Sequence, residues 1–583
     1  MSDITYPGAP PADVGIAAPR RARFRVCPDT GLKVDRQAEA QMKAHAVAAV
    51  VFLLIGGLMG LGVGLTRWPE VHLLEAGQFY QVLTAHGINL LIFWIIFFEM
   101  AALIFTSSTV LGARLATPRL GWVAYGLMVT GALLNNYAVL VQGNSSVMMT
   151  SYVPMPADTM FYVGLILFAV GALIVCFMFL GTLIIAKAEK TYEGSIPLVT
   201  FGGLTACIIA IFTIASGAVI LIPTLLWNLG LVSNVDAGVY RLIWWAFGHS
   251  SQQINVTVHV TIWYAIAAIV FGAKPLSEKV SRFAFLLYIA VLQIASAHHL
   301  LVDPGLSSEW KIFNTSYAMY LAVMASMVHG LTVPGSIEAA QRAHGFNAGL
   351  FQWLRKAPWG NPVFSGMFIS LIGFGVLGGI TGVVMGAEQI NLIVHNTLYV
   401  PGHFHGTVVV GTTLAFMAFS YWLVPMLFRR ELVLPKLASW QPYIFGLGMT
   451  GVSLFLMGAG TLGVPRRHWD ILFSSTDAGY EFSAAALTMM SLNGMSVVLA
   501  AIGGTAFIVV IVGTVLFGRR MGEDEKMPGI TFARAPAKEA YRGIGTHGLI
   551  IPGTLVMVFV FFAVFALYYF INWKYLAQTW GLS

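Results

Sequence analysis

Long apolar runs constrain the fold of this chain more than any other feature of the sequence. A run of about 20 apolar residues can cross a bilayer as a helix. In lipid a spanning segment must satisfy its own backbone hydrogen bonds, so such runs favour helices. The sequence therefore predicts an all-α polytopic membrane protein with thirteen spans, near residues 44–66, 79–107, 120–141, 158–187, 199–226, 238–270, 280–303, 313–333, 363–386, 395–428, 440–463, 488–518 and 549–572.

The composition excludes a water-soluble protein. Of the 583 residues, 57% are hydrophobic and only 10% are charged, whereas soluble proteins carry roughly 25% charged residues. So few charged groups cannot cover the surface of a cytosolic or secreted protein of this size. The aromatic content of 13% also excludes a disordered chain.

Lysine and arginine are distributed unevenly between alternate connections of the apolar runs. The segment 1–43 and every second connection after it carry 26 of the 32 basic residues. Basic connections stay in the cytoplasm. The pattern predicts a cytoplasmic basic tail at 1–43, a transmembrane domain at 44–575 and a short outer C-terminus at 576–583. The net charge of +7 then reflects topology and requires no nucleic-acid partner.

The three cysteines, Cys27, Cys176 and Cys207, form no CxxC or CxxCH pattern. This excludes a c-type haem attachment, a zinc knuckle and an iron–sulfur site within the chain.

Histidines in and beside the apolar runs are the strongest functional signal, because polar groups are costly there. His403 and His405 stand two positions apart in PGHFHGT, so on a helix they point about 200° apart. They cannot chelate one ion, but they can each hold a haem on opposite faces of the helix. His298 and His299 are adjacent and can reach one ion only from an irregular helix end, which the following Asp303–Pro304–Gly305 turn would supply.

Two further histidines complete the set. His249, in WWAFGHSSQQIN, would add a third imidazole to an ion site suited to copper, iron or zinc. His86, in TAHGINLL, is followed by Gly87, which would let a flat macrocycle approach the backbone. Together the six histidines provide ligands for a six-coordinate haem, a five-coordinate haem and an ion. Taken singly, each histidine of the ion site is better interpreted as a hydrogen-bonded contact residue between helices, and the pair at His403 and His405 is equally consistent with a buried structural role.

Five motifs resemble the catalytic subunit I of the haem–copper oxidase superfamily. They are His86 in the second run, WWxxGH ending at His249, the His298–His299 pair, VHNTLYVPGHFH at 394–405 and GVPRRHWD at 463–470. The resemblance covers about residues 40–575 and is greatest to the B-type oxidases, whose subunit I has thirteen helices.

The resemblance implies a role for each residue. His86 and His405 would ligate a low-spin haem, of type b by expectation, and His403 would be the proximal ligand of a high-spin haem. His249, His298 and His299 would bind the second metal, copper or non-haem iron. Arg466 and Arg467 would hold the haem propionates by charge-assisted hydrogen bonds, and His395 and Asn396 would line the same region.

The resemblance also implies a location in the cytoplasmic membrane of a bacterium or archaeon, and it implies partners. Electrons would come from a donor subunit on the outer side, of cupredoxin, dinuclear copper or cytochrome c type, although quinol is an alternative donor. The substrate would be a small gas. A transporter or channel with buried histidines is the alternative class, and a haem spectrum distinguishes it.

One departure from the family pattern concerns the reaction. A- and B-type oxygen reductases carry a tyrosine four residues after the histidine that corresponds to His249, and here that position is Gln253. The C-type enzymes place the tyrosine on the seventh helix, where Tyr288 lies about 15 Å from His298 along a helix. Nitric oxide reductases also lack this tyrosine, so the leading prediction is a non-standard nitric oxide reductase. The alternative is a cytochrome c oxidase that reduces oxygen to water.

Gln253 itself has two interpretations. Its amide could ligate the metal weakly or hydrogen-bond the substrate, or it could belong to an inert polar cluster with Gln252 and Asn255. Candidates for proton transfer are scattered through the apolar runs: Glu99, Tyr264, Ser277, Thr315, Ser316, His329 and Glu388.

Overall fold

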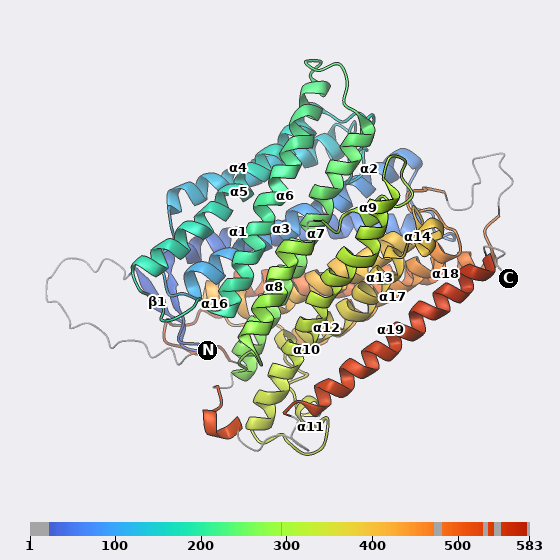
Figure 1. Cartoon of the computed structure of the whole chain (residues 1–583). Coiled ribbons are helices and arrows are strands. Elements are labelled where there is room, and N and C mark those ends of the chain that lie inside the picture. The colour runs from blue at the N-terminus through green and yellow to red at the C-terminus, as the bar shows by residue number, and fades with distance from the viewer. Residues whose placement is uncertain (1–22, 293, 471–480, 529–534, 542–549, 580–583) are drawn as a thin grey trace.

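Membrane-spanning helices form most of the computed structural model, which describes residues 23–292, 294–470, 481–528, 535–541 and 550–579. Within these ranges, twelve helices are long and apolar enough to cross a membrane. They pack side by side in one bundle (Figure 1). This confirms the all-α polytopic architecture predicted from the apolar runs.

The spans are of two kinds. Some are uninterrupted α-helices: α1 (Arg36–Thr66), α5 (Thr159–Ala188), α6 (Leu198–Asn228), α7 (Ala237–Phe271), α17 (Pro435–Thr461), α18 (Ala484–Phe517) and α19 (Pro552–Thr579). The others contain π-helical turns: α2 (Ala76–Gly87), η1 (Ile88–Trp94), α3 (Ile95–Ile104) and η2 (Phe105–Thr109); α4 (Pro118–Asn136) and η3 (Tyr137–Val141); α9 (Ser308–Phe313), η5 (Asn314–Ala318) and α10 (Met319–Ala343); α12 (Pro362–Gly373), η6 (Phe374–Ile380) and α13 (Thr381–Gly386); and α15 (Tyr399–Phe404), η7 (His405–Thr413) and α16 (Leu414–Phe428). π-helical turns frequently mark functional sites.

The run expected at 280–303 forms a shorter helix, α8 (Glu278–Leu292). The chain then continues through a turn at 294–296 into the 3₁₀ turn η4 (Ala297–His299). The irregular backbone therefore begins before the histidine pair, and not at the Asp303–Pro304–Gly305 turn after it. The remaining short elements are α11 (Gln352–Arg355), α14 (Glu388–Val394) and η8 (Lys538–Tyr541).

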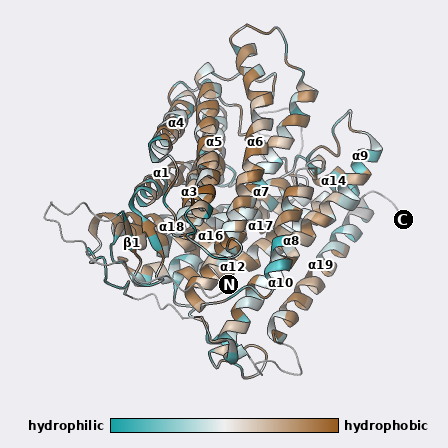
Figure 2. Cartoon of the chain, turned by 60° about the vertical axis from the view of Figure 1, so that its left-hand side comes forward, coloured by the Kyte–Doolittle hydropathy of each residue, from teal (hydrophilic) through white to brown (hydrophobic). Residues whose placement is uncertain are grey.

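Apolar surface and close backbone contacts explain how the helices pack. Hydrophobic residues run along most of α5 and α6 (Figure 2). Between helices in lipid, van der Waals contact replaces the hydrophobic effect as the main attraction, so small residues are favoured where helices meet. Gly131 of α4 and Gly164 of α5 show this directly, because a Cβ at either glycine would overlap the carbonyl oxygen of the other.

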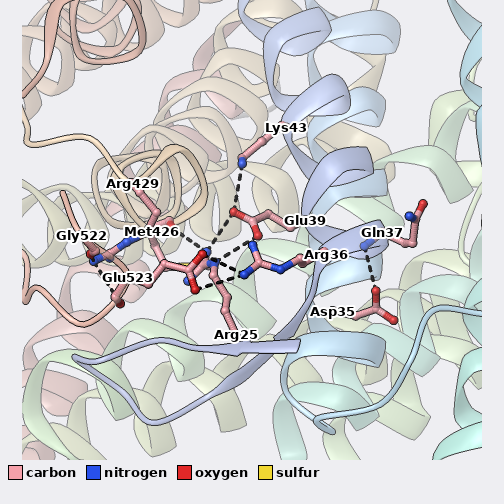
Figure 3. A network of polar contacts seen from close by, with 10 residues as sticks. All are labelled: Arg25, Asp35, Arg36, Gln37, Glu39, Lys43, Met426, Arg429, Gly522 and Glu523. Carbon is pink, nitrogen blue, oxygen red and sulfur yellow. Dashed lines mark hydrogen bonds and ion pairs between the residues drawn. The ribbon is translucent and has the colours of Figure 1, made fainter. Parts of the chain in front are cut away.

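The segment before the first span is folded against the bundle. Strands β1 (Phe24–Val26) and β2 (Lys33–Asp35) form an antiparallel hairpin, and the Asp35 side chain caps α1 by accepting from the Gln37 N–H at 2.8 Å. The helix therefore begins at Arg36, earlier than the expected boundary at residue 44. Arg25 of the hairpin forms a buried ion pair with Glu39 at 3.0 Å (Figure 3). Residues 1–22 of the expected tail lie outside the described residues.

The hairpin and the C-terminal end of α19 lie at opposite ends of the bundle (Figure 1). Ends on opposite sides require an odd number of crossings, so the shorter helix α8 counts as a crossing beside the twelve longer ones. The expected outer C-terminus at 576–583 continues α19 as far as Thr579, and residues 580–583 lie outside the described part of the chain.

Candidate active site

A cavity of about 1180 Å³ lies between the helices. A typical small-molecule site occupies roughly 300–1,000 Å³, so this cavity has room for more than one ligand. All six histidines predicted as ligands line it: His86, His249, His298, His299, His403 and His405. Gln253, Arg466 and Arg467 also line it, whereas His395 and Asn396 do not.

His86 and His405 form a nearly parallel pair across one part of the cavity. Their rings are inclined by 12° and their centroids are 6.2 Å apart. Nδ1 of His86 lies 2.9 Å from the carbonyl oxygen of Gly56, and Nδ1 of His405 lies 2.6 Å from that of Pro401. A carbonyl only accepts, so each Nδ1 carries the proton and each Nε2 keeps its lone pair. Two metal–nitrogen bonds of about 2 Å plus the two half-rings span roughly this separation.

Glycine in α1 allows the His86 ring to pack there. A Cβ at Gly60 would lie 2.6 Å from Cε1 of His86, closer than a side chain permits. At Gly87, the position expected to admit a macrocycle, a Cβ would instead approach Met149 at 3.1 Å. The sequence contained no signal for Gly60, because α1 contains several glycines and only the packing identifies the one under His86.

His403 turns toward a different helix from His405, as the two-residue spacing predicted. Its Nδ1 lies 2.9 Å from Oγ1 of Thr381 at the start of α13. The Thr381 hydroxyl donates to the Leu377 carbonyl at 2.5 Å, so its oxygen accepts from Nδ1 of His403. Nε2 of His403 therefore keeps its lone pair, and hydrogen bonds of this kind orient metal-ligating imidazoles. Sequence reasoning missed Thr381.

His249, His298 and His299 form the cluster best suited to a metal ion among the described residues. Their ligand nitrogens all lie within 4.8 Å of one another, and Nδ1 of His249 is 3.1 Å from Nε2 of His299. The 3₁₀ turn η4 lets the two adjacent rings face the same point. Trp245 stacks on His299 with 3.7 Å between ring centroids. Sequence reasoning gave Trp245 no role, although it belongs to the WWxxGH motif.

Gln253 lies one helical turn after His249 and contacts it. The Gln253 amide nitrogen is 2.8 Å from Nε2 of His249, which leaves Nδ1 of His249 directed at His299. Asn255 contacts other groups: with its amide oriented to satisfy both neighbours, it donates to Glu99 Oε1 at 2.7 Å and to the Ser251 carbonyl at 3.2 Å. Gln253 and Asn255 therefore bond to different groups and not to each other.

No tyrosine ring of the described residues contacts this cluster. Among the described residues, the aromatic rings in contact with the three histidines are those of the histidines themselves and Trp245. The Tyr288 hydroxyl instead forms a hydrogen bond with the Ser326 hydroxyl, with 2.9 Å between the two oxygens. The Tyr288 ring packs against His329. The structure thus provides no phenol in contact with the predicted second-metal site.

The proton-transfer candidates separate into two groups. Glu99 is buried and lines the cavity. Tyr264 is hydrogen-bonded to Ser281, His329 and Thr332, at 3.0, 3.1 and 2.5 Å. The others lie elsewhere: Thr315 donates to the Lys311 carbonyl, Glu388 pairs with Lys311 at 3.6 Å, and Ser277 and Ser316 do not line the cavity.

The two predicted arginines are held by a short backbone pairing. The Arg466 N–H donates to the Asn396 carbonyl at 2.9 Å, and Thr397 pairs with Pro465. Asn396 has a φ of 59°, in the left-handed region that asparagine tolerates. Asn396 thus contributes its backbone to the site. Burial, together with the adjacent charge of Arg467, lowers the pKa of Arg466 to about 9.

A third arginine, Arg67, also lines the cavity. Nε of Arg67 and Nε of Arg466 are buried without a hydrogen-bond partner. In the described part of the chain, no carboxylate lies within ion-pair distance of Arg67, Arg466 or Arg467. Buried guanidinium groups without counter-ions fit a cavity that takes anionic ligands, and the carboxylates of haem propionates meet that need. The neutral nitrogen donors fit copper or iron in the same way.

Known proteins share this arrangement of helices and motifs. The family described as "Cytochrome C and Quinol oxidase polypeptide I" matches residues 41–502. Cytochrome c oxidase subunit 1 of Thermus thermophilus is 30% identical over 436 residues, covering 72% of this chain and 75% of that protein. Quinol oxidase subunit 1 of Bacillus spizizenii is 23% identical, covering 73% of this chain and 65% of its own length. A solved heme-copper terminal oxidase dimer superposes with a TM-score of 0.79 at 25% identity, covering 91% and 92% of the two chains.

Proposed function

The chain belongs to the family of subunit I of cytochrome c and quinol oxidases, and from this membership we propose that it is the catalytic subunit of a membrane reductase that converts nitric oxide to nitrous oxide. The observation that carries the proposal is the contact between Gln253 and Nε2 of His249. The A- and B-type oxygen reductases that the sequence resembles carry a tyrosine at that position.

The cavity residues define where the cofactors would bind. His86 and His405 would hold a low-spin haem, His403 a high-spin haem, and His249, His298 and His299 a copper or iron ion. When bound, these groups supply single electrons and a Lewis-acidic site for a gas molecule. Arg466 and Arg467 would hold the haem carboxylates.

The chemistry of the two reactions distinguishes the two gases. Two molecules of nitric oxide take two electrons and two protons to give nitrous oxide and water. Oxygen takes four of each, and its O–O bond has to break. A phenol beside the metal can provide an electron and a proton at that step, whereas an amide can provide neither. A site with Gln253 in contact with His249 is therefore better suited to nitric oxide.

The chain's own residues then have defined tasks. Gln253 orients His249, and Trp245 fixes the plane of His299. The mostly apolar cavity wall excludes water and admits a small neutral gas. Glu99, held by Asn255 at the cavity wall, can store and release a proton there.

Electrons would enter from a partner subunit of copper or cytochrome c type on the outer side, with quinol as the alternative donor. The distribution of lysine and arginine supports a cytoplasmic N-terminus. The proposal places the electron-entry centre in a partner subunit because the three cysteines form no CxxC or CxxCH pattern.

The test compares the two gases on one preparation. The purified membrane complex is given the same electron donor and either nitric oxide without oxygen or oxygen alone. Nitric oxide loss is followed with an electrode, nitrous oxide by gas chromatography, and oxygen loss with a second electrode. We expect nitric oxide to be consumed much faster than oxygen, with one nitrous oxide formed per two nitric oxide molecules.

Variants at two neighbouring glutamines sharpen this test. Gln253→Ala should lower nitric oxide turnover about 10-fold or more, because a mispositioned ligand costs at least that much. Gln252→Ala removes an amide that also lines the cavity without contacting His249, and should change turnover little.

Oxygen reduction is the second candidate, since the relatives above are named as oxidases. Faster consumption of oxygen than of nitric oxide, together with loss of oxygen consumption in Gln253→Glu at unchanged nitric oxide turnover, would establish it instead.

A further inference from the structure

The outer wall of the cavity carries one more cation than the family motifs assign. Arg67 follows the last residue of α1, and only 5% of its surface is exposed. Its guanidinium donates to the Arg466 carbonyl and lies 5.4 Å over the Phe79 ring. Neither contact neutralises the charge, and burial lowers the pKa of Arg67 to about 10.

The position of Arg67 on α1 relates it to His86. The Gly56 carbonyl accepts from His86, and Gly60 packs against the same ring. Arg67 is seven residues after Gly60, which is nearly two helical turns, so the two residues lie within about 20° on the same face. The rise along α1 is then about 10 Å. One face of α1 thus contacts the His86 ring and, further out, carries a buried cation.

The three cavity arginines come from different parts of the chain. Arg67 directly follows α1, the helix that contacts the His86 ring, whereas Arg466 and Arg467 lie in the connection between α17 and α18. The charge of Arg67 therefore belongs to the part of the cavity nearest His86.

We propose that Arg67 binds a carboxylate of the low-spin haem, as a third haem-anchoring cation beside Arg466 and Arg467. The proposal rests on the haem site proposed at His86 and His405. Nε of Arg67 is buried without a hydrogen-bond partner among the described residues, and Arg67 lines the cavity, so a carboxylate bound there would satisfy this donor. An anion there offsets the cost of the buried charge, and the bond is charge-assisted.

A redox titration of the purified complex tests the assignment. Reduction is followed by absorbance and by magnetic circular dichroism, which separates six-coordinate from five-coordinate haem. Removing a nearby positive charge stabilises the oxidised, more positive haem. Arg67→Met should therefore lower the midpoint potential of the low-spin haem and shift that of the high-spin haem less. Arg67→Lys, which keeps the charge, should restore most of the shift.

Lys311→Met is the matched control, because it removes an outer basic residue that already pairs with Glu388. It should leave both potentials unchanged. Selective loss of the low-spin haem from Arg67→Met, with the high-spin spectrum retained, would also support the assignment. An unchanged low-spin potential, or equal shifts of both haems, would overturn it. Absence of a six-coordinate haem from the unaltered complex would instead overturn the proposed haem site.

Discussion

Arginines at the two ends of the bundle differ in how their charge is balanced. At the end that carries the hairpin, Arg25 pairs with Glu39 and Arg36 with Glu523 (Figure 3). Around the cavity, Arg67, Arg466 and Arg467 have no carboxylate within ion-pair distance in the described part of the chain. The first two arginines have carboxylate partners within the protein. The three cavity arginines would gain their counter-ions from the carboxylates of the proposed haems. A missing counter-ion does not by itself identify a ligand-binding arginine, because Arg429 at the hairpin end donates only to backbone carbonyls among the described residues; the three proposed ligand-binding arginines also line the cavity.

The largest expected effect is at a fully buried ion pair. Glu338 and Arg342 are 2.8 Å apart with side chains 0% and 1% exposed, and Glu338 also accepts from Gly553 and Thr554 at the start of α19. Glu338→Gln leaves a buried guanidinium without its counter-ion. We expect a destabilisation of about 3–5 kcal/mol, measured as a lower thermal unfolding temperature in detergent. The double variant with Arg342→Met should recover part of the loss, and no recovery would mean that the backbone bonds to α19 dominate.

A cavity arginine should behave differently. Arg466→Met removes a charge that has no protein counter-ion, so its main effect should be on haem. A charge-assisted hydrogen bond contributes about 1.5–3 kcal/mol, so its loss should weaken haem binding roughly 10- to 100-fold. The haem that stays bound after dilution and gel filtration measures this weakening. If Arg466→Met lowered the unfolding temperature as much as Glu338→Gln and kept its haem, the cavity arginines would not differ from the paired ones.

The hairpin arginine should have an intermediate effect on stability. Arg25→Met breaks a buried pair, but Lys43 still contacts Glu39 at 2.9 Å. Because Glu39 keeps a cation, we expect the free energy of unfolding to fall by roughly 1–2 kcal/mol. The haem content should not change. The double variant Arg25→Met with Lys43→Met should be destabilised by more than the sum of the two single variants. If the two destabilisations simply add, Lys43 does not compensate for the loss of Arg25.

The smallest effect is expected at an exposed ion pair. Arg519 contacts Glu431 and Glu525, but 56% of its side chain is exposed. Water and salt screen such pairs. Arg519→Ala should leave the unfolding temperature and the haem content unchanged at physiological ionic strength. A clear drop in either would mean that exposure alone does not rank these arginines.

Much of the cavity was predictable because the motifs are local in sequence. The HxH spacing at His403 and His405 fixes opposite directions on any helix, and both directions occur in the structure. The pair at His298 and His299 indicated an irregular helix end, although the break occurs earlier than expected. Their roles as ligands, like those of His86 and His249, stay predictions.

Other parts of the cavity could not be predicted from local patterns. The residues that orient the imidazoles include Thr381 and the carbonyls of Gly56 and Pro401, and none of these has a side-chain signature for the task. The pairing of Gln253 with one particular nitrogen of His249 depends on a side-chain rotamer. Glu99 and Asn255 meet across two helices, and no spacing in the sequence relates them.

The sequence by itself determined that this chain spans a membrane many times and that six histidines belong to apolar segments. Those properties follow from the lengths of apolar runs and from helical spacing, which are local. Only the tertiary structure decided which histidine nitrogens face the cavity, which glycine accommodates His86 and which arginines lack a counter-ion. These depend on contacts between helices far apart in the chain, and a buried charge is balanced or unbalanced only once all its neighbours are in place.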